Sequence, residues 1–175
     1  MNDVWADDGR LSSVERYDPA ANAVLDGKLY AAGGYDDDYL SSVERYDPAL
    51  DAWETVAPML TARGDHGVAV LDGKLYAVGR MATARQEHAV AVLDGKLYAV
   101  GGIYDDEVSS VERYDWEEVG EGAVHFAPMA VKRFAPGVAV LDGKLYALGG
   151  FGVSSVERYN PAANAWEAVA PMARR

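Results

Sequence analysis

Apolar residues occur along this chain in short runs that are interrupted by Asp-Gly and by acidic stretches. The clearest pattern is Val-Leu-Asp-Gly-Lys-Leu-Tyr-Ala at 70–77, which recurs without change at 24–31, 92–99 and 140–147. Asp-Gly between two apolar runs is a strong signal for a two-residue hairpin turn with φ > 0. Each copy therefore predicts a β-hairpin, and the four copies predict a repeat protein.

A second pattern follows most of these hairpins. Ser-Ser-Val-Glu-Arg-Tyr stands at 12–17, 41–46, 109–114 and 154–159, and in two copies a Trp comes seven residues after the Tyr, at Trp53 and Trp166. A full unit thus reads as four antiparallel strands, which we name A, B, C and D. Strands A and B are almost continuously apolar, as in a sheet covered on both faces, so the sheets are expected to stack face to face.

These motifs resemble the Kelch repeat. The similarity rests on the stretches at 67–79 and 141–150 for strands A and B, and on 154–159, Trp166 and Ala-Pro-Met at 170–172 for the rest. It covers nearly the whole chain and implies a β-propeller of four-stranded blades. The Gly-Gly pairs at 33–34, 101–102 and 149–150 are then expected to allow close backbone approach between blades and an unusual φ. The Tyr and Trp of strands C and D are expected to be core aromatics rather than ligand-stacking groups.

The spacing of the motifs shows where the pattern breaks. The Val-Leu-Asp-Gly blocks begin at 24, 70, 92 and 140, so the second interval lacks half a repeat and leaves only a hairpin at 66–79. We predict one all-β domain over 1–175, a Kelch-like β-propeller of about four blade-like units that is incomplete or irregularly closed. Its units are about 1–22 (partial), 23–59, 60–80 (half), 81–129 and 130–175. Exposed blade edges would allow self-association.

Charge and composition narrow the class of function. The formal net charge is -12, from 28 acidic and 16 basic residues, which argues against a nucleic-acid or anionic-membrane partner. No apolar run approaches the roughly 18 residues of a membrane span, and the first residues lack the pattern of a secretory signal. A soluble, cytoplasmic protein is expected.

No catalytic, metal or cofactor site is expected. His66 and His88 hold the same place in two repeats, just before strand A, so repeat geometry explains them better than metal binding. Kelch proteins include galactose-oxidase-like copper enzymes, but their cofactor needs a Cys-modified Tyr and this chain has no Cys. The acidic clusters at 36–38 and 105–107 lack the alternating pattern of a calcium loop.

The loops remain as the carriers of function, because the strands are used for packing. In Kelch proteins the B–C and D–A loops gather on one face and bind a partner protein or peptide. The partner-binding residues predicted here are Tyr35, Asp36, Asp37, Asp38, Tyr39, Arg63, Asp65, Arg85, Gln86, Tyr104, Asp105, Asp106, Arg133, Phe134 and Phe151. Aromatic residues within an acidic rim suit a basic partner.

Two other functions stay open from sequence. One is an enzyme on a propeller scaffold, such as a sugar epimerase, and a converging acid–base pair in a pocket would support it. The other is a truncated repeat array without function. In many Kelch proteins a BTB domain provides a link to cullin ubiquitin ligases, and a substrate-adaptor role is open to this chain only as a fragment of a longer protein.

Overall fold

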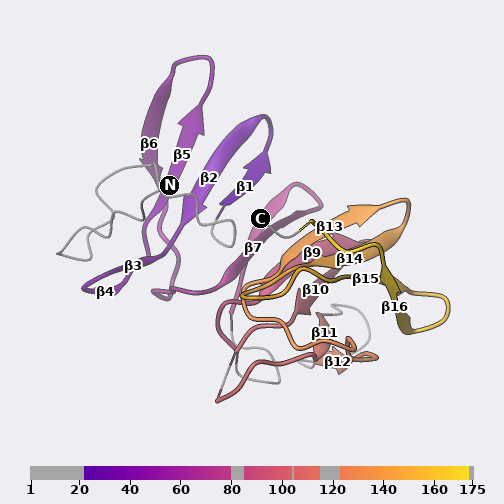
Figure 1. Ribbon diagram of the computed structural model, residues 1–175. Helices are drawn as coiled ribbons and strands as arrows, with labels where there is room; N and C mark the ends of the chain where they lie inside the picture. The colour runs from indigo at the N-terminus through magenta and orange to yellow at the C-terminus, as the bar shows by residue number, and fades with distance from the viewer. Residues whose placement is uncertain (1–21, 80–84, 104, 115–122, 174–175) are drawn as a thin grey trace.

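The computed structural model describes residues 22–79, 85–103, 105–114 and 123–173, and these form strands and loops without a helix (Figure 1). Three antiparallel four-stranded sheets and one hairpin succeed each other along the chain. The first blade has the order β1-β2-β5-β6, with β1 Asn22–Leu25, β2 Lys28–Ala32, β5 Val43–Asp47 and β6 Ala52–Val56. A two-residue pair, β3 Tyr35–Asp36 and β4 Asp38–Tyr39, lies in its B–C loop.

The next unit is only a hairpin, of β7 Gly67–Leu71 and β8 Lys74–Val78. The central blade has the strands β9 Ala89–Leu93, β10 Lys96–Val100, β11 Val111–Tyr114 and β12 Ala123–His125. The last blade has the strands β13 Gly137–Leu141, β14 Lys144–Leu148, β15 Val156–Asn160 and β16 Ala165–Val169. Among the described residues, the hairpin predicted at 66–79 is present as the two-stranded sheet of β7 and β8, whereas the strand C predicted at 12–17 lies outside them.

The hairpin turns form as the Asp-Gly signal predicts. In the hairpin unit, Asp72 has φ 49° and Gly73 has φ 67°, and the other three copies take nearly the same values. Two successive positive φ angles give the turn whose twist matches that of the flanking strands. Asp tolerates this conformation better than most side chains do, and Gly has no Cβ to oppose it.

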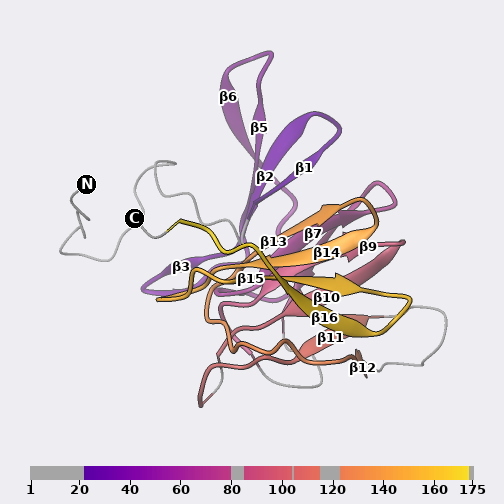
Figure 2. The ribbon, with the colours of Figure 1, turned by 45° about the vertical axis from the view of Figure 1, so that its right-hand side comes forward.

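The strand A of each unit lies next to the strand A of the following unit. β1 contacts β7, β7 contacts β9, and β9 contacts β13, which is the arrangement of a propeller with its first strands innermost. The hairpin unit and the two later blades stack closely, whereas the first blade rises away from them in both views (Figures 1 and 2). The described residues thus form an open, incomplete propeller, as predicted.

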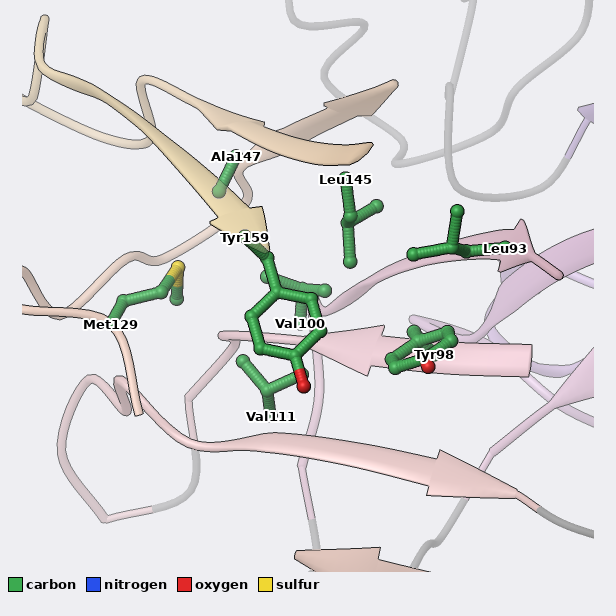
Figure 3. Packing of buried hydrophobic residues seen from close by; sticks show 8 residues of the cluster. All are labelled: Leu93, Tyr98, Val100, Val111, Met129, Leu145, Ala147 and Tyr159. Carbon is green, nitrogen blue, oxygen red and sulfur yellow. The ribbon is translucent and has the colours of Figure 1, made fainter. Parts of the chain in front are cut away.

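The main core lies between the central and last blades. Tyr159 is fully buried and its ring centroid lies 6.2 Å from that of Tyr98 and 5.3 Å from that of Trp166. Figure 3 shows Tyr159 among the aliphatic side chains of both blades; the cluster is Leu93, Tyr98, Val100, Val111, Met129, Leu145, Ala147 and Tyr159. Burying each large apolar side chain stabilises the fold by about 1.5–3 kcal/mol.

The polar atoms of this aromatic pair have partners. The Tyr159 hydroxyl donates to Asn164 Oδ1 at 2.9 Å, and Trp166 Nε1 donates to the Ala127 carbonyl at 3.0 Å, which ties the last blade to the loop after the central one. The expected core role of the Tyr and Trp is confirmed in the last blade. In the first blade, Tyr46 and Trp53 lie 5.4 Å apart but are only half-buried, because fewer residues cover that blade.

Candidate interaction surface

The structure brings the B–C loops and the D–A loops together at one end of the blades. The Gly34 amide donates to the Arg63 carbonyl at 2.8 Å, and the Gly102 amide donates to the Arg133 carbonyl at 2.8 Å. In the last blade, the Phe151 amide donates to the Phe134 carbonyl at 2.9 Å. We call this end of the molecule the loop face. It contains the B–C loops at 33–42, 101–103 with 105–110, and 149–155, and the connections at 57–66, 85–88 and 126–136.

Successive connections are also joined to each other. The Glu87 amide donates to the Asp65 carbonyl at 3.2 Å, and the Ala135 amide donates to the Glu87 carbonyl at 3.1 Å. These three residues hold the same place in three units and all have positive φ, of 52°, 51° and 47°. A continuous backbone link therefore runs along the inner side of the loop face, which positions the loops outside it.

The first blade contributes a projecting acidic hairpin to the loop face. β3 and β4 pair across Asp37, which has φ 58°, and the three aspartates at 36–38 are exposed. Tyr35 and Tyr39 are 56% and 45% exposed and meet edge to face, with ring centroids 5.7 Å apart. Two accessible aromatic rings thus lie directly beside three carboxylates.

The later blades contribute a similar combination. Phe134 and Phe151 have ring centroids 6.1 Å apart, and Phe151 is 74% exposed. Asp105 and Asp106 are exposed in the B–C loop of the central blade. Lys132 hydrogen-bonds to Asp106 and thereby holds the pKa of that carboxyl below its ordinary value. Tyr104, which was predicted to belong to this group, lies outside the described residues.

Arg85 and Arg133 do not lie on the surface, so their prediction as exposed loop residues needs correction. They are 4% and 0% exposed. Arg85 forms a buried ion pair with Glu112 and donates to the carbonyls of Gly101 at 3.0 Å and Ser110 at 3.1 Å. The guanidinium fork has five donors in fixed geometry, and strand C of the same unit supplies several of their acceptors.

Arg133 repeats this arrangement in the last blade. It pairs with Glu157 at 3.0 Å and donates to the Ser155 carbonyl at 2.9 Å and the Ser155 hydroxyl at 3.0 Å, with Gly149 as a further carbonyl acceptor. The two buried glutamates were missed at the sequence level. The signal was present, because both complete later units have an Arg before strand A and Ser-Ser-Val-Glu at the start of strand C.

The remaining predicted residues line a hollow between the first blade and the hairpin unit. Its volume is about 520 Å³, and its lining includes Tyr39, Arg63, Asp65, Gly79 and Gln86. Gln86 is exposed, whereas Arg63 and Asp65 are half-buried. The structure therefore places these residues together, on the inner side of the acidic hairpin.

His66 and His88 are buried at the junctions of the hairpin unit, at 3% and 1% exposure. His88 Nε2 donates to the Val78 carbonyl at 3.0 Å. Burial, and then the positive charge of Arg85, lower the pKa of His88 to about 4. A neutral imidazole that hydrogen-bonds to backbone is a structural element of the blade junction. Over the described ranges, no group of three or more His, Cys, Asp or Glu could hold a metal ion.

Comparison with known proteins identifies the repeat. A family model described as the Kelch motif matches residues 19–60, 84–118 and 132–173, which together make up more than half of the chain. The chain belongs to the Kelch motif family. The matched Kelch stretches contain the first and last blades and the strands β9, β10 and β11 of the central blade, whereas β12 and the strands of the hairpin unit lie between the stretches. No curated protein matches the chain.

A solved structure is similar in fold to this Kelch chain. It is described as a novel fungal alcohol oxidase with catalytic diversity among the AA5 family, in complex with copper. The TM-score is 0.63 at 18% sequence identity, and the alignment covers 87% of this chain and 43% of the oxidase chain. The likeness shows the propeller fold, and this chain spans less than half the length of that enzyme. Within the described ranges, no helix is long and apolar enough to cross a membrane.

Proposed function

We propose that this Kelch chain is a protein-interaction module whose loop face binds a segment with basic side chains next to apolar ones. Kelch repeats commonly mediate protein–protein interaction, and the scaffold leaves the loops free for it. The observation that supports a basic partner is the burial of Arg85 and Arg133. Each pairs with a buried glutamate inside its own blade, so neither offsets the exposed acids of the loops.

The charge that remains at the loop face is strongly asymmetric. Asp36, Asp37, Asp38 and Asp105 are exposed, whereas the exposed cation Lys132 is already paired with Asp106. Carboxylates around a site attract a cationic partner and raise its association rate. The face is therefore more negative than its sequence composition suggests.

Apolar anchors lie within this acidic surface. Tyr35, Tyr39 and Phe151 are exposed, and aromatic side chains are enriched among residues that contribute most to binding. Each exposed ring has a second ring against it, Tyr35 against Tyr39 and Phe134 against Phe151. Pre-positioned rings lose little rotamer freedom on binding, which favours their use as contact surfaces.

The test is selection of displayed random 12-residue peptides on the full chain, followed by kinetic binding measurements on the selected peptides. We expect sequences rich in Lys or Arg beside Leu, Phe or Trp, with affinity that falls as salt is added. Changing Asp36, Asp37 and Asp38 together to Asn should weaken binding roughly 10-fold, mainly through a slower association rate.

The matched control changes Asp26, Asp72 and Asp142 to Asn. It removes the same charge from the exposed A–B turns at the other end of the strands, and Asn accepts the positive φ of those positions. Binding should be nearly unchanged. Selection of acidic peptides, with affinity unaffected by the loop substitutions and lost in Arg63→Met, would show that the proposal is wrong.

A further inference from the structure

The connection that leads into the last blade contains a complete binding site for one carboxylate. The Glu157 carboxylate accepts from the backbone amides of Ala130 at 2.7 Å and Val131 at 3.2 Å, and from the Arg133 guanidinium at 3.0 Å. Hydrogen bonds to an ionised group are the strong ones, and a buried carboxylate needs several of them to remain charged. All three donors lie within four consecutive residues, and strand C of the last blade supplies the acceptor.

The connection before the hairpin unit is held by the same two hydrogen bonds as the connection before the last blade. The amides of Met59 and Arg63 donate to carbonyls of the B–C loop of the first blade at 2.8 and 2.9 Å. Those of Met129 and Arg133 donate to carbonyls of the B–C loop of the central blade at 2.9 and 3.2 Å. Both stretches read Met-x-x-x-Arg. The backbone of the carboxylate site is therefore repeated before the hairpin unit.

The donors of this second site have no acceptor from the chain. Leu60 and Thr61 hold the places of Ala130 and Val131, and Arg63 holds that of the last-blade arginine. Over the described ranges, neither amide donates to another residue and no acidic side chain pairs with Arg63. The stretch from 70 to 92 lacks the Ser-Ser-Val-Glu sequence that supplies the acceptor in the last blade.

The position of the missing carboxylate is open space. The hollow between the first blade and the hairpin unit, of about 520 Å³, is lined by Thr61, Arg63 and Gly79. The end of Arg63 is directed to the exit of β8, since a Cβ added to Gly79 would lie 2.7 Å from its Nη1. Leu60, directly before Thr61, is fully exposed and provides an apolar contact beside the amides.

The acidic residue in the same hollow is compatible with a bound carboxylate. Asp65 is half-buried in the lining. Its counterpart in the central blade is Glu87, and there the buried Arg85–Glu112 pair is formed nevertheless. An acid at this position of the connection therefore does not prevent the arginine from holding a second carboxylate.

We propose that this hollow binds a carboxylate on a short aliphatic stem, the glutamate side chain of an extended segment of a partner protein. The carboxylate accepts from the amides of Leu60 and Thr61 and from Arg63. A serine two residues before the glutamate accepts from the same guanidinium, as the Ser155 hydroxyl accepts from Arg133 at 3.0 Å. The site takes one acidic side chain and does not depend on the basic segment proposed for the outer loop face.

The test compares two blocked peptides, Ser-Ser-Val-Glu, which is the sequence at 154–157, and the same peptide with Gln in place of Glu. The full chain is titrated with each and followed by amide NMR spectra. The Glu peptide should bind about 10-fold more tightly, because charge-assisted hydrogen bonds are stronger than neutral ones. It should also shift the amide protons of Leu60 and Thr61 downfield. Equal affinities, or amide signals of Leu60 and Thr61 that do not move, would overturn the proposal.

Variants show whether the guanidinium is responsible. Arg63→Met should abolish the preference for the Glu peptide, whereas the control Lys74→Met removes the same charge from the exposed A–B turn of the hairpin unit and should preserve it. Changing Asp36, Asp37 and Asp38 together to Asn should not weaken the Glu peptide, so this proposal and that for the outer loop face can fail separately. A preference retained in Arg63→Met, or free glutarate bound as tightly as the peptide, would overturn the assignment.

Discussion

The hairpin unit and the last blade begin with the same strand sequence, Gly-Val-Ala-Val-Leu, in β7 and β13, yet their burial is opposite. Leu71 of β7 is 6% exposed, whereas the equivalent Leu141 of β13 is 58% exposed, and Ala69 is buried where Ala139 is exposed. The pairing register within each hairpin is the same. Local sequence thus sets the strands and the turn, while the neighbouring units decide which side chains are covered.

The reason lies in the order of the units. β7 lies between β1 and β9, whereas β13 contacts β9 on one side. In the second strands, β14 and β8, the difference in burial is reversed. Leu145 of β14 is fully buried against the central blade and β15, whereas the equivalent Leu75 of β8, which has no strand C beside it in the described part of the chain, is half-buried. The second strand of the last blade is thus covered by β15 and by the central blade, whereas the hairpin unit is covered mainly by the units on both sides of β7.

The strongest test of this difference removes the Arg from each region. Arg133→Met should destabilise the fold by about 3–5 kcal/mol, because it leaves Glu157 buried without its ion-pair partner. Arg63→Met should cost less than about 1 kcal/mol, since Arg63 is only half-buried. Urea unfolding followed by Trp fluorescence measures both. Similar losses would mean that Arg63 is already satisfied within its own chain.

The glycines after strand B provide the next comparison. Gly101→Val should cost about 2–4 kcal/mol, because Gly101 has φ 65° and an added Cβ would lie 2.7 Å from the Arg133 carbonyl oxygen. Gly79→Val should be tolerated at less than about 1 kcal/mol, because there the added atom meets the movable end of Arg63. Thermal melting of the two variants checks this, and equal melting temperatures would contradict the assigned contacts.

Acid should destabilise the junction between the hairpin unit and the central blade, where His88 is buried. His88 has a pKa of about 4 in the folded chain and an ordinary value of 6.5. Its neutral form therefore contributes stability above pH 6.5 that is lost as the pH falls toward 4, by about 3 kcal/mol at most. The last blade has Pro136 at this position and lacks the effect. Denaturant midpoints between pH 7 and pH 4 should fall less in His88→Gln; parallel curves would exclude His88 as the cause.

The smallest effect concerns local opening. Amides of β8 should exchange with solvent roughly 10–100-fold faster than those of β14, because β14 is paired on both sides and β8 on one among the described residues. Hydrogen exchange with mass spectrometry on dilute protein measures this difference. Uniform protection across the four units would show that the hairpin unit is no weaker than a complete blade.

Much of the fold could be predicted from sequence because the repeats carry local signals. The Asp-Gly pairs predicted the turns, and the apolar runs predicted the strands. The short interval between the motifs that begin at 70 and 92 indicated the missing half-repeat. The ion pairs of Arg85 and Arg133 were not predicted, because their acceptors come from strands more than twenty residues later. The exposure of Leu29 at 43%, against 0% for Leu145 in the same motif, is equally outside local sequence.

The candidate site was predicted in outline. The acidic and aromatic loop residues lie at one end of the blades, and their role in binding remains a prediction. Two of the three arginines predicted for this site are buried. Their burial changes the charge of the surface more than any other difference between the prediction and the structure. Counting charges along the chain could not reveal this, because a buried ion pair contributes nothing to the exterior.

The backbone link through Asp65, Glu87 and Ala135 bears on how such a chain can evolve. The first connection joins positions 22 residues apart and the second joins positions 48 residues apart, with nearly the same geometry. Strands C and D lie outside this link, and the buried Arg of the central blade and that of the last blade each pair within their own blade. A deletion that removes one pair of outer strands therefore leaves the inner connection and the neighbouring ion pairs intact. Duplication and loss can change the number of strands one half-repeat at a time, and the surviving units need no compensating substitutions.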